Sequence, residues 1–297
     1  MINFSLTNEQ VAIQEKYRDF SERWIKPNAL KYDKLAEFPW EVVKAAYNEG
    51  IVNGPMPDQF GGNGYSIYEG ALASEELGAG CIGIGICIDA NTLALTPMFL
   101  AANDAQQKKW FGRIIEEKGV AAYALTEPNA GSDVAGIKSS AILTGDKYIL
   151  NGHKRFITNA EVSTFMTVFA LTDPSRGARS LTAFVVPTNS PGVEIKPLLQ
   201  KMGQKASVQN EIIFTDVEVP VENRLGDEGY GFVIAMKTFD RTRTGVAALS
   251  VGAARTAFEV SRDWAKNRIQ FGKPIAAQQA VAFMLADMAT DLEVARL

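Results

Sequence analysis

Three segments of the chain carry residue types that suit ligand binding. The first, Tyr123–Asp133, reads YALTEPNAGSD. Pro128 stiffens this segment and Gly131 tolerates positive φ, so the backbone can fold into a concave turn. Such a turn would present backbone N–H groups and the hydroxyls of Thr126 and Ser132 to a ligand rich in carbonyl or phosphate oxygens. A plain turn between two strands is the alternative interpretation.

The second segment, Gly152–Asn159, places Phe156, Ile157 and Thr158 next to one another. An aromatic ring beside a β-branched residue and a hydroxyl could pack against a flat ligand ring and bond to its edge. A strand with an ordinary core phenylalanine would contain the same residues, so both interpretations stay open.

The third segment, Arg268–Lys273, is followed by the glutamines Gln278 and Gln279. The guanidinium of Arg268 could bind a phosphate through two parallel hydrogen bonds. A solvated cation at the end of a helix explains Arg268 equally well, because it complements the negative end of the helix dipole.

Composition excludes several other classes of function. A net charge of -4 leaves no basic footprint for nucleic acid or an anionic membrane. The single histidine, His153, argues against a histidine-based triad and a typical zinc site, so no metal is predicted. Cys81 and Cys87 lie in an apolar stretch and are interpreted as small core residues.

The apolar runs predict no membrane insertion, because none reads as long enough to span a bilayer. The N-terminus, Met1–Ser5, has neither a basic region followed by an apolar run nor the arginine-rich pattern of a transit peptide. The cytoplasm is therefore the expected compartment.

The elements that position the three segments change in type along the chain. Residues 1–117 show an apolar period of 3.6, which predicts a helical domain. Thr7 and Gln10 form a capping-box pattern, and a helix is predicted from Pro39 to Gly50. Further helices are predicted over Tyr68–Leu77, Ile86–Leu100 and Ala105–Glu117.

Residues 118–227 change to a period of 2, which predicts a small antiparallel barrel or sandwich. Gly145-Asp146 is a two-residue hairpin signal within it. The predicted strands are Ala121–Thr126, Ala141–Thr144, Lys147–Leu150, Phe165–Leu171, Leu181–Pro187, Val193–Ile195 and Glu211–Val219. Residues 228–297 return to a helical period that breaks at 271–274, so the fold class is α+β with three domains.

The last predicted helix begins at Ile275 and shows no stop signal before Leu297. Its apolar residues form one stripe, at Val281, Leu285, Met288, Leu292 and Ala295. Such a stripe needs a facing partner. We therefore expect a C-terminally truncated chain with an incomplete helical bundle, which would aggregate through the uncovered stripe.

Four segments together resemble, in order and spacing, the acyl-CoA dehydrogenase family. They are Tyr123–Asp133, Arg155–Asn159, Phe239–Arg243 and Arg268–Lys273. Phe60-Gly61-Gly62 and Ser74–Leu77 extend the resemblance over the whole chain, which looks most similar to the short- and medium-chain straight-chain enzymes. The resemblance implies α,β-desaturation of a saturated acyl-CoA to a trans-2-enoyl-CoA, by removal of an α-proton and hydride transfer to N5 of FAD.

The resemblance also implies which residues bind the ligands. Those expected to contact FAD are Tyr123, Leu125, Thr126, Gly131, Ser132, Phe156, Ile157 and Thr158. Those expected to reach the FAD of a neighbouring subunit are Arg268, Phe271 and Gln279. Those expected to contact acyl-CoA are Asp89, Ser132, Asp240, Thr242 and Arg243. Thr126 would lie near the flavin pyrimidine edge, Phe156 beside the ring and Thr158 near N5.

The resemblance implies a homo-oligomer, a dimer of dimers in the full-length protein, and an electron-transfer flavoprotein as the partner. The catalytic base, a glutamate, is expected beyond Leu297, and poor FAD binding is expected of a chain that ends there. Tyr68-Glu69-Gly70 looks like the motif of that base but lies in the helical N-terminal region. Thr242 matches the position where some members carry the base and cannot serve, while Asp240 matches an acyl-CoA contact.

Three alternatives remain at this point. A non-catalytic module that binds FAD or acyl-CoA would follow if 297 residues were the natural length. An enoyl-CoA reductase and an acyl-CoA oxidase are closer alternatives within the same resemblance, and the choice of electron acceptor would separate them.

Overall fold

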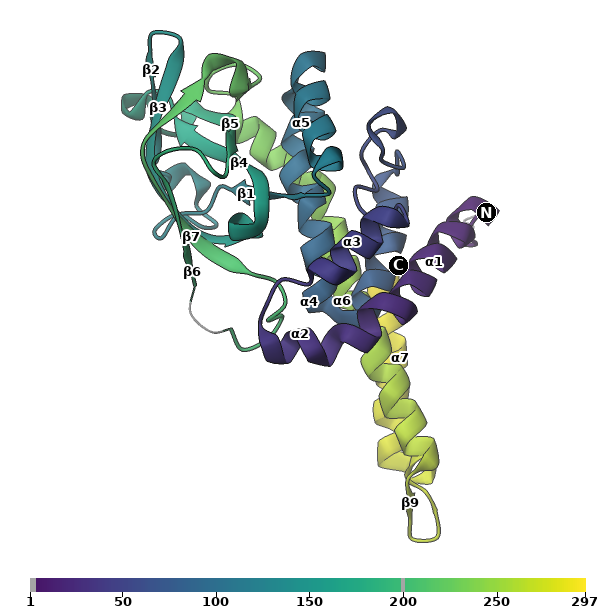
Figure 1. Ribbon diagram of the computed structural model, residues 1–297. Helices are drawn as coiled ribbons and strands as arrows, with labels where there is room; N and C mark the ends of the chain where they lie inside the picture. Colours follow the sequence, from purple (N-terminus) through teal and green to yellow (C-terminus); the bar gives the residue numbers. More distant parts are fainter. Residues whose placement is uncertain (1–3, 199–200) are drawn as a thin grey trace.

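The computed structural model describes residues 4–198 and 201–297, and its elements follow the predicted order of helices, strands and helices (Figure 1). This order confirms the α+β fold class. The N-terminal helices are α1 (Asn8–Phe20), α2 (Ala29–Leu35), α3 (Trp40–Asn48), α4 (Ile67–Ala101) and α5 (Asp104–Glu116). A π-helical turn, Ser21–Ile25, and a 3-10 turn, Lys26–Asn28, connect α1 to α2.

Reciprocal capping boxes fix the starts of α1 and α4, and Asn103 and Gln106 form another at the start of α5. The Thr7 hydroxyl accepts from Gln10 N at 3.2 Å, and Gln10 Oε1 accepts from Thr7 N at 3.0 Å, as predicted. Ser66 and Glu69 form the same reciprocal pair at the start of α4. Glu69 therefore satisfies the backbone at a helix N-terminus, which agrees with its exclusion as a catalytic base.

Helix α4 is longer than the sequence suggested. Two helices, Tyr68–Leu77 and Ile86–Leu100, were expected on either side of a glycine-rich gap, and the 35-residue element does consist of two helical parts that meet at a kink at Cys81. Only Cys81 leaves the helical region, with φ -170° and ψ 116°, while Cys87 is buried as predicted. Packing against α6 stabilises the helical backbone at glycine positions, where the low helix propensity of glycine is unfavourable.

The length and composition of α4 bear on one expectation about the membrane. Among the described residues, α4 is the one helix long and apolar enough to cross a bilayer by length and composition, with a mean hydropathy of 1.5 over its most apolar window. Of that window, 56% is buried inside the protein. By length and composition alone, α4 departs from the prediction that no apolar run is long enough, a property that a mostly buried core helix can share.

The sheet has eight strands in the order β6-β7-β3-β2-β4-β5-β8, with β1 paired to β4. Their bounds are β1 Val120–Ala124, β2 Ser140–Thr144, β3 Lys147–Thr158, β4 Ser163–Leu171, β5 Leu181–Pro187, β6 Val193–Pro197, β7 Gln209–Pro220 and β8 Arg224–Leu225. Most pairs are antiparallel, as predicted, but β1–β4 and β2–β4 are parallel. The chain between β1 and β4 holds the whole β2–β3 hairpin, and this length permits the parallel crossover.

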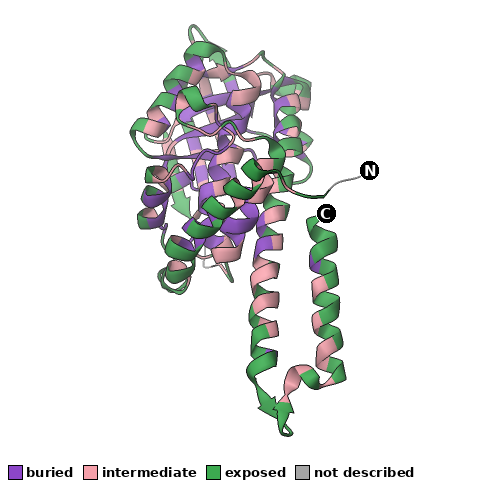
Figure 2. Cartoon of the chain, turned by 90° about the vertical axis from the view of Figure 1, so that its right-hand side faces the viewer, coloured by how far each residue is buried: buried purple, intermediate pink, exposed green. Residues whose placement is uncertain are grey.

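The C-terminal region is a long helical hairpin. Helix α6 (Gly231–Asn267) leads into the short strands β9 (Ile269–Gln270) and β10 (Lys273–Pro274), and α7 (Gln279–Arg296) runs back. The predicted break at 271–274 is thus a tight β-turn. Figure 2 shows the distal half of α6 and most of α7 projecting from the body, with largely exposed surfaces. Of the predicted stripe on α7, Leu292 is buried while Met288 is 43% exposed.

Helices α4 and α6 cross in direct backbone contact. A Cβ added to Gly78 would overlap the carbonyl group of Leu249, and one added to Gly252 would overlap the carbonyl oxygen of Glu75. Both positions therefore require glycine. The crossing fixes the distance between the two helices that flank the cavity described next.

Candidate active site

One cavity of about 670 Å³ lies between α4, α6 and the end of β3. Leu77, Ile88 and Phe99 of α4 contribute apolar wall to it. Thr158 from β3 and Thr242 from α6 bring hydroxyl-bearing side chains to the same space. A mainly apolar enclosure with a few polar groups suits a small molecule that has an apolar chain.

Asp89 is the carboxylate of this cavity, and it faces Gly245 on α6. Its Oδ1 accepts a hydrogen bond from the Ser74 hydroxyl at 3.0 Å. A Cβ added to Gly245 would lie 3.4 Å from Ser74 Oγ and 3.5 Å from Asp89 Oδ2. Burial raises the pKa of Asp89 to about 6, because the hydrogen bond from Ser74 only partly offsets the loss of water.

Thr242 lies one turn before Gly245, and its hydroxyl donates to Thr238 O at 2.9 Å. The predicted substrate residues Asp89 and Thr242 therefore meet in one cavity. Asp240 and Arg243 do not line it, because their side chains are 71% and 69% exposed and pair with each other at 3.5 Å. They remain available to a part of the ligand outside the cavity.

The loop that follows β1 carries the predicted flavin contacts. Tyr123 packs its ring against Phe239 with centroids 5.9 Å apart, and Leu125 is buried in the core. Gly131 and Ser132 are exposed, and a Cβ at Gly131 would meet nothing within 4 Å. Across residues 4–198 and 201–297, no partner accepts from the backbone N–H of Thr126, Gly131 or Ser132. The loop therefore offers several donors to a ligand rich in oxygens, which fits the isoalloxazine edge and phosphates of FAD.

Strand β3 ends beside this loop, since Arg155 N donates to Thr126 O at 2.9 Å. The register against β7 shifts between Lys154 and Ile157, and Phe156 has φ 59° with 57% of its surface exposed. This left-handed backbone is unfavourable for an aromatic residue, so the surrounding ladder must hold it. The strained bulge turns the Phe156 ring to the surface next to the loop, whereas the Ile157 side chain enters the sheet core.

The third predicted segment lies far from the cavity, at the tip of the C-terminal hairpin (Figure 1). Arg268, Phe271 and Gln279 are exposed, and Phe271 is 93% exposed with φ 53°. Within one chain they do not join the residues around Thr126 and Thr158. Their placement is compatible with a ligand held by another copy of the chain.

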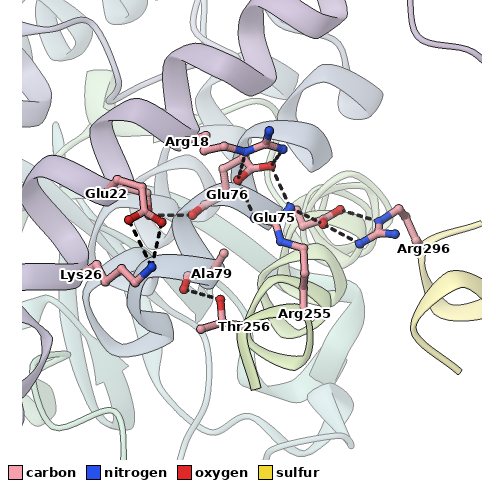
Figure 3. Close-up of polar contacts among 10 residues, drawn as sticks. Arg18, Glu22, Lys26, Glu75, Glu76, Ala79, Arg255, Thr256 and Arg296 are labelled. Carbon is pink, nitrogen blue, oxygen red and sulfur yellow. Dashed lines mark hydrogen bonds and ion pairs between the residues drawn. The ribbon is translucent and has the colours of Figure 1, made fainter. Parts of the chain in front are cut away.

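A cluster of buried charges lies on the other side of α4 (Figure 3). Glu75 and Glu76 both contact Arg255 of α6, at 2.8 and 2.5 Å. Arg18 of α1 contacts Glu76 at 2.9 Å, and Arg296 of α7 contacts Glu75 at 3.1 Å. Burial opposes ionisation of Glu76, but the hydrogen bonds from Arg255 and Arg18 outweigh it and hold its pKa below the ordinary value. The Ser74–Leu77 segment thus has a clear structural task in joining four helices.

Two further residues, which no sequence motif singled out, belong to this region: Glu127 within the loop and Lys154 on β3. They form an ion pair of 2.8 Å in which the Lys154 side chain has no exposed surface. The alternation of buried residues along β3 could have indicated the pair, because Lys154 lies on the same buried face of the strand as Tyr148 and Leu150. A lysine in that row needs a buried partner.

Comparison with known proteins agrees with this geometry. Models of the N-terminal, middle and C-terminal domains of acyl-CoA dehydrogenase match residues 7–118, 122–217 and 229–297. The chain is 40% identical to the probable medium-chain specific acyl-CoA dehydrogenase 2 of Caenorhabditis briggsae, over 100% of this chain and 73% of that protein.

Two solved structures have nearly the same fold. The first was reported with the electron transferring flavoprotein of Acidaminococcus fermentans. It has a TM-score of 0.95 at 40% identity, over 99% of this chain and 78% of that one. The second, butyryl-CoA dehydrogenase from Megasphaera elsdenii, has a TM-score of 0.94 at 36% identity with the same coverage. The chain therefore belongs to the acyl-CoA dehydrogenases, FAD-dependent oxidoreductases that act on the CH–CH bond of acyl-CoA thioesters.

Proposed function

We propose that the cavity between α4, α6 and β3 holds the acyl chain of an acyl-CoA thioester while the loop after β1 holds FAD. One observation carries this proposal: Thr158 lines the cavity two residues after Phe156, and the neighbouring Arg155 binds the loop at Thr126 O. The reacting carbons of the thioester and the flavin edge would therefore meet near Thr158.

Each part of the chain has a defined task in this arrangement. FAD, when bound, supplies the acceptor for the hydride that leaves the β-carbon. The Thr126, Gly131 and Ser132 N–H groups and the Thr126 and Ser132 hydroxyls would bind and orient it, with Phe156 packed beside the ring. The apolar cavity wall would hold the acyl chain and exclude water from the reacting carbons.

We assign Asp89 to the acyl chain and propose no catalytic base among the described residues. Thr242 has no group that can accept the α-proton, and Asp240 lies outside the cavity. The paired Asp89 and Ser74 place a polar group on an otherwise apolar wall. Short and medium acyl chains are the proposed substrates, in line with the subfamily resemblance.

The remaining assignments are also proposals. Domain limits of 1–117, 118–227 and 228–297 are supported by the three matching family models. We propose an electron-transfer flavoprotein as acceptor and a cytoplasmic homotetramer. In that assembly Arg268, Phe271 and Gln279 would reach the FAD of a neighbouring subunit, and Asp240 and Arg243 would contact the CoA portion.

The test fills the cavity and follows the two ligands separately. Gly245→Leu would place a side chain against Ser74 and Asp89, so butyryl-CoA and octanoyl-CoA should no longer perturb the flavin spectrum while FAD still binds. Gly112→Leu on α5 is the matched control, because a side chain there meets nothing within 4 Å. Equal acyl-CoA binding by wild type and Gly245→Leu would reject the cavity as the acyl site.

A further inference from the structure

Lys154 is a fully buried lysine on β3. Its ammonium lies 2.8 Å from Glu127 Oε1 and donates to the carbonyl oxygen of Leu125 at 2.9 Å. Burial lowers the pKa of Lys154 to about 8, and the Glu127 carboxylate acts against this loss of charge. The lysine thus joins the sheet to two residues of the loop after β1.

Glu127 fixes the same loop from its other side. Its carboxylate accepts from Lys138 N at 2.8 Å and from Ser139 N at 3.0 Å, and it is 8% exposed. Its backbone exchanges two hydrogen bonds with Ala130, at 3.0 and 3.2 Å. The carboxylate therefore ties the start of the loop to the segment that enters β2.

These bonds decide which way the peptide groups of the loop point. In a trans peptide the C=O of one residue and the N–H of the next point in opposite directions. Lys154 draws the Leu125 carbonyl toward the sheet interior, so the Thr126 N–H must point the other way. That N–H is one of the loop donors without a partner in the described chain.

We propose that the Lys154–Glu127 pair is a positioning device that turns the Leu125–Thr126 peptide so that its N–H faces the flavin. This inference rests on the FAD site proposed above. The pair is neutral as a whole, so it acts by orienting donors and adds little net charge to the site. Its loss removes one oriented hydrogen bond to FAD and lowers the stability of the electron-rich reduced cofactor.

The decisive variant separates orientation from stability. Lys154→Met alone leaves Glu127 buried without its cation and destabilises the fold for that reason. Lys154→Met with Glu127→Gln removes both charges and should recover most of the melting temperature. The double variant still lacks the donor to Leu125 O, so it should bind FAD about tenfold more weakly, a loss typical of one hydrogen bond.

Two properties of the bound cofactor are measured: FAD affinity, by flavin fluorescence titration, and the reduction potential of the flavin. We expect weaker binding and a more negative potential in the double variant. Lys147→Met is the matched control on the same strand, because the Lys147–Glu218 pair is largely exposed. It should change neither readout.

If wild type binds FAD and the double variant matches it in affinity and potential, the positioning role is wrong while the FAD site stands. If wild-type protein does not bind FAD at all, the proposed function fails and the inference fails with it.

Discussion

Two groups of buried charges differ in how many partners each carboxylate has. In the helical region, Glu75 and Glu76 share Arg255, and each has a second arginine, Arg296 or Arg18. In the sheet, Glu127 has Lys154 as its one cation among the described residues. The helical cluster holds four helices together, whereas the sheet pair holds one loop.

The difference shows what each arrangement can tolerate. Arginines at the helical cluster are partly exposed, between 15% and 50%, so water can reach a carboxylate that loses one of them. Lys154 is completely enclosed. We expect the loss of one arginine from the helical cluster to lower the free energy of unfolding only modestly, because other arginines and water still contact the carboxylates. Loss of the single enclosed lysine should lower it more.

The largest effect is expected for Lys154→Met. It leaves the Glu127 carboxylate with backbone donors alone, so the free energy of unfolding should fall by about 3 kcal/mol, the low end for breaking a buried pair. Urea denaturation of wild type and variant measures the change. A loss below about 1 kcal/mol would mean that the enclosed pair is no more sensitive than a surface pair.

Arg255→Met should lower the free energy of unfolding by less than Lys154→Met does, although Arg255 contacts two glutamates. Arg18 and Arg296 remain in place, so we expect a loss of about 2 kcal/mol in the same denaturation experiment. If this variant is less stable than Lys154→Met, the second arginines do not compensate for the loss of Arg255.

Asp89 is a third buried carboxyl, and no cation pairs with it in the described structure. Its pKa is raised from 3.8 to about 6 by burial, so its favourable contribution is complete below pH 3.8 and is lost as the pH rises through 6. Asp89→Asn should therefore stabilise the protein by about 1–2 kcal/mol at pH 8. This is less than the full shift implies, because the side chain is partly exposed to the cavity.

The same pair of proteins compared near pH 4 should show almost no difference in the free energy of unfolding. Stabilisation by Asp89→Asn that stays constant from pH 4 to pH 8 would show that burial of the charge is not its cause.

The smallest effect is expected for Arg18→Met. Its side chain is 50% exposed, and Glu76 keeps both contacts with Arg255. A loss of less than about 1 kcal/mol is expected from thermal or urea unfolding. A loss as large as that of Arg255→Met would mean that the Arg18–Glu76 contact stabilises the protein far more than a half-exposed ion pair should.

Local signals predicted much of the fold. The Thr7–Gln10 capping box, the Gly145-Asp146 turn and the limits of β5 all depend on neighbouring residues, and the structure confirms them. The parallel pairing of β1 with β4 depends on residues some forty positions apart and has no local signature. The close approach of Gly78 on α4 to Leu249 on α6 likewise depends on a distant partner.

In the candidate site, too, some placements could be predicted from the sequence and others could not. The resemblance placed Asp89, Thr158 and Thr242 near a ligand, and the structure brings them to one cavity. Asp240 lies two residues before Thr242, so helical geometry turns it away by about 200°. That separation could be read from the sequence. The contact between Lys154 and Glu127 could not, because it depends on how the loop folds back onto β3.

The glycine crossing of α4 and α6 limits how this cavity can evolve. Gly78 and Gly252 leave no room for a methyl group, so any larger residue must push the helices apart. Gly252 contacts the backbone of Glu75, and such a push would also separate Glu75 and Glu76 from Arg255. Substitutions that separate the two helices would therefore disturb the cavity and the charge cluster together. If the cavity holds the acyl chain as proposed, its depth can still change at lining positions such as Asp89 and Gly245, where a substitution leaves the helix crossing intact.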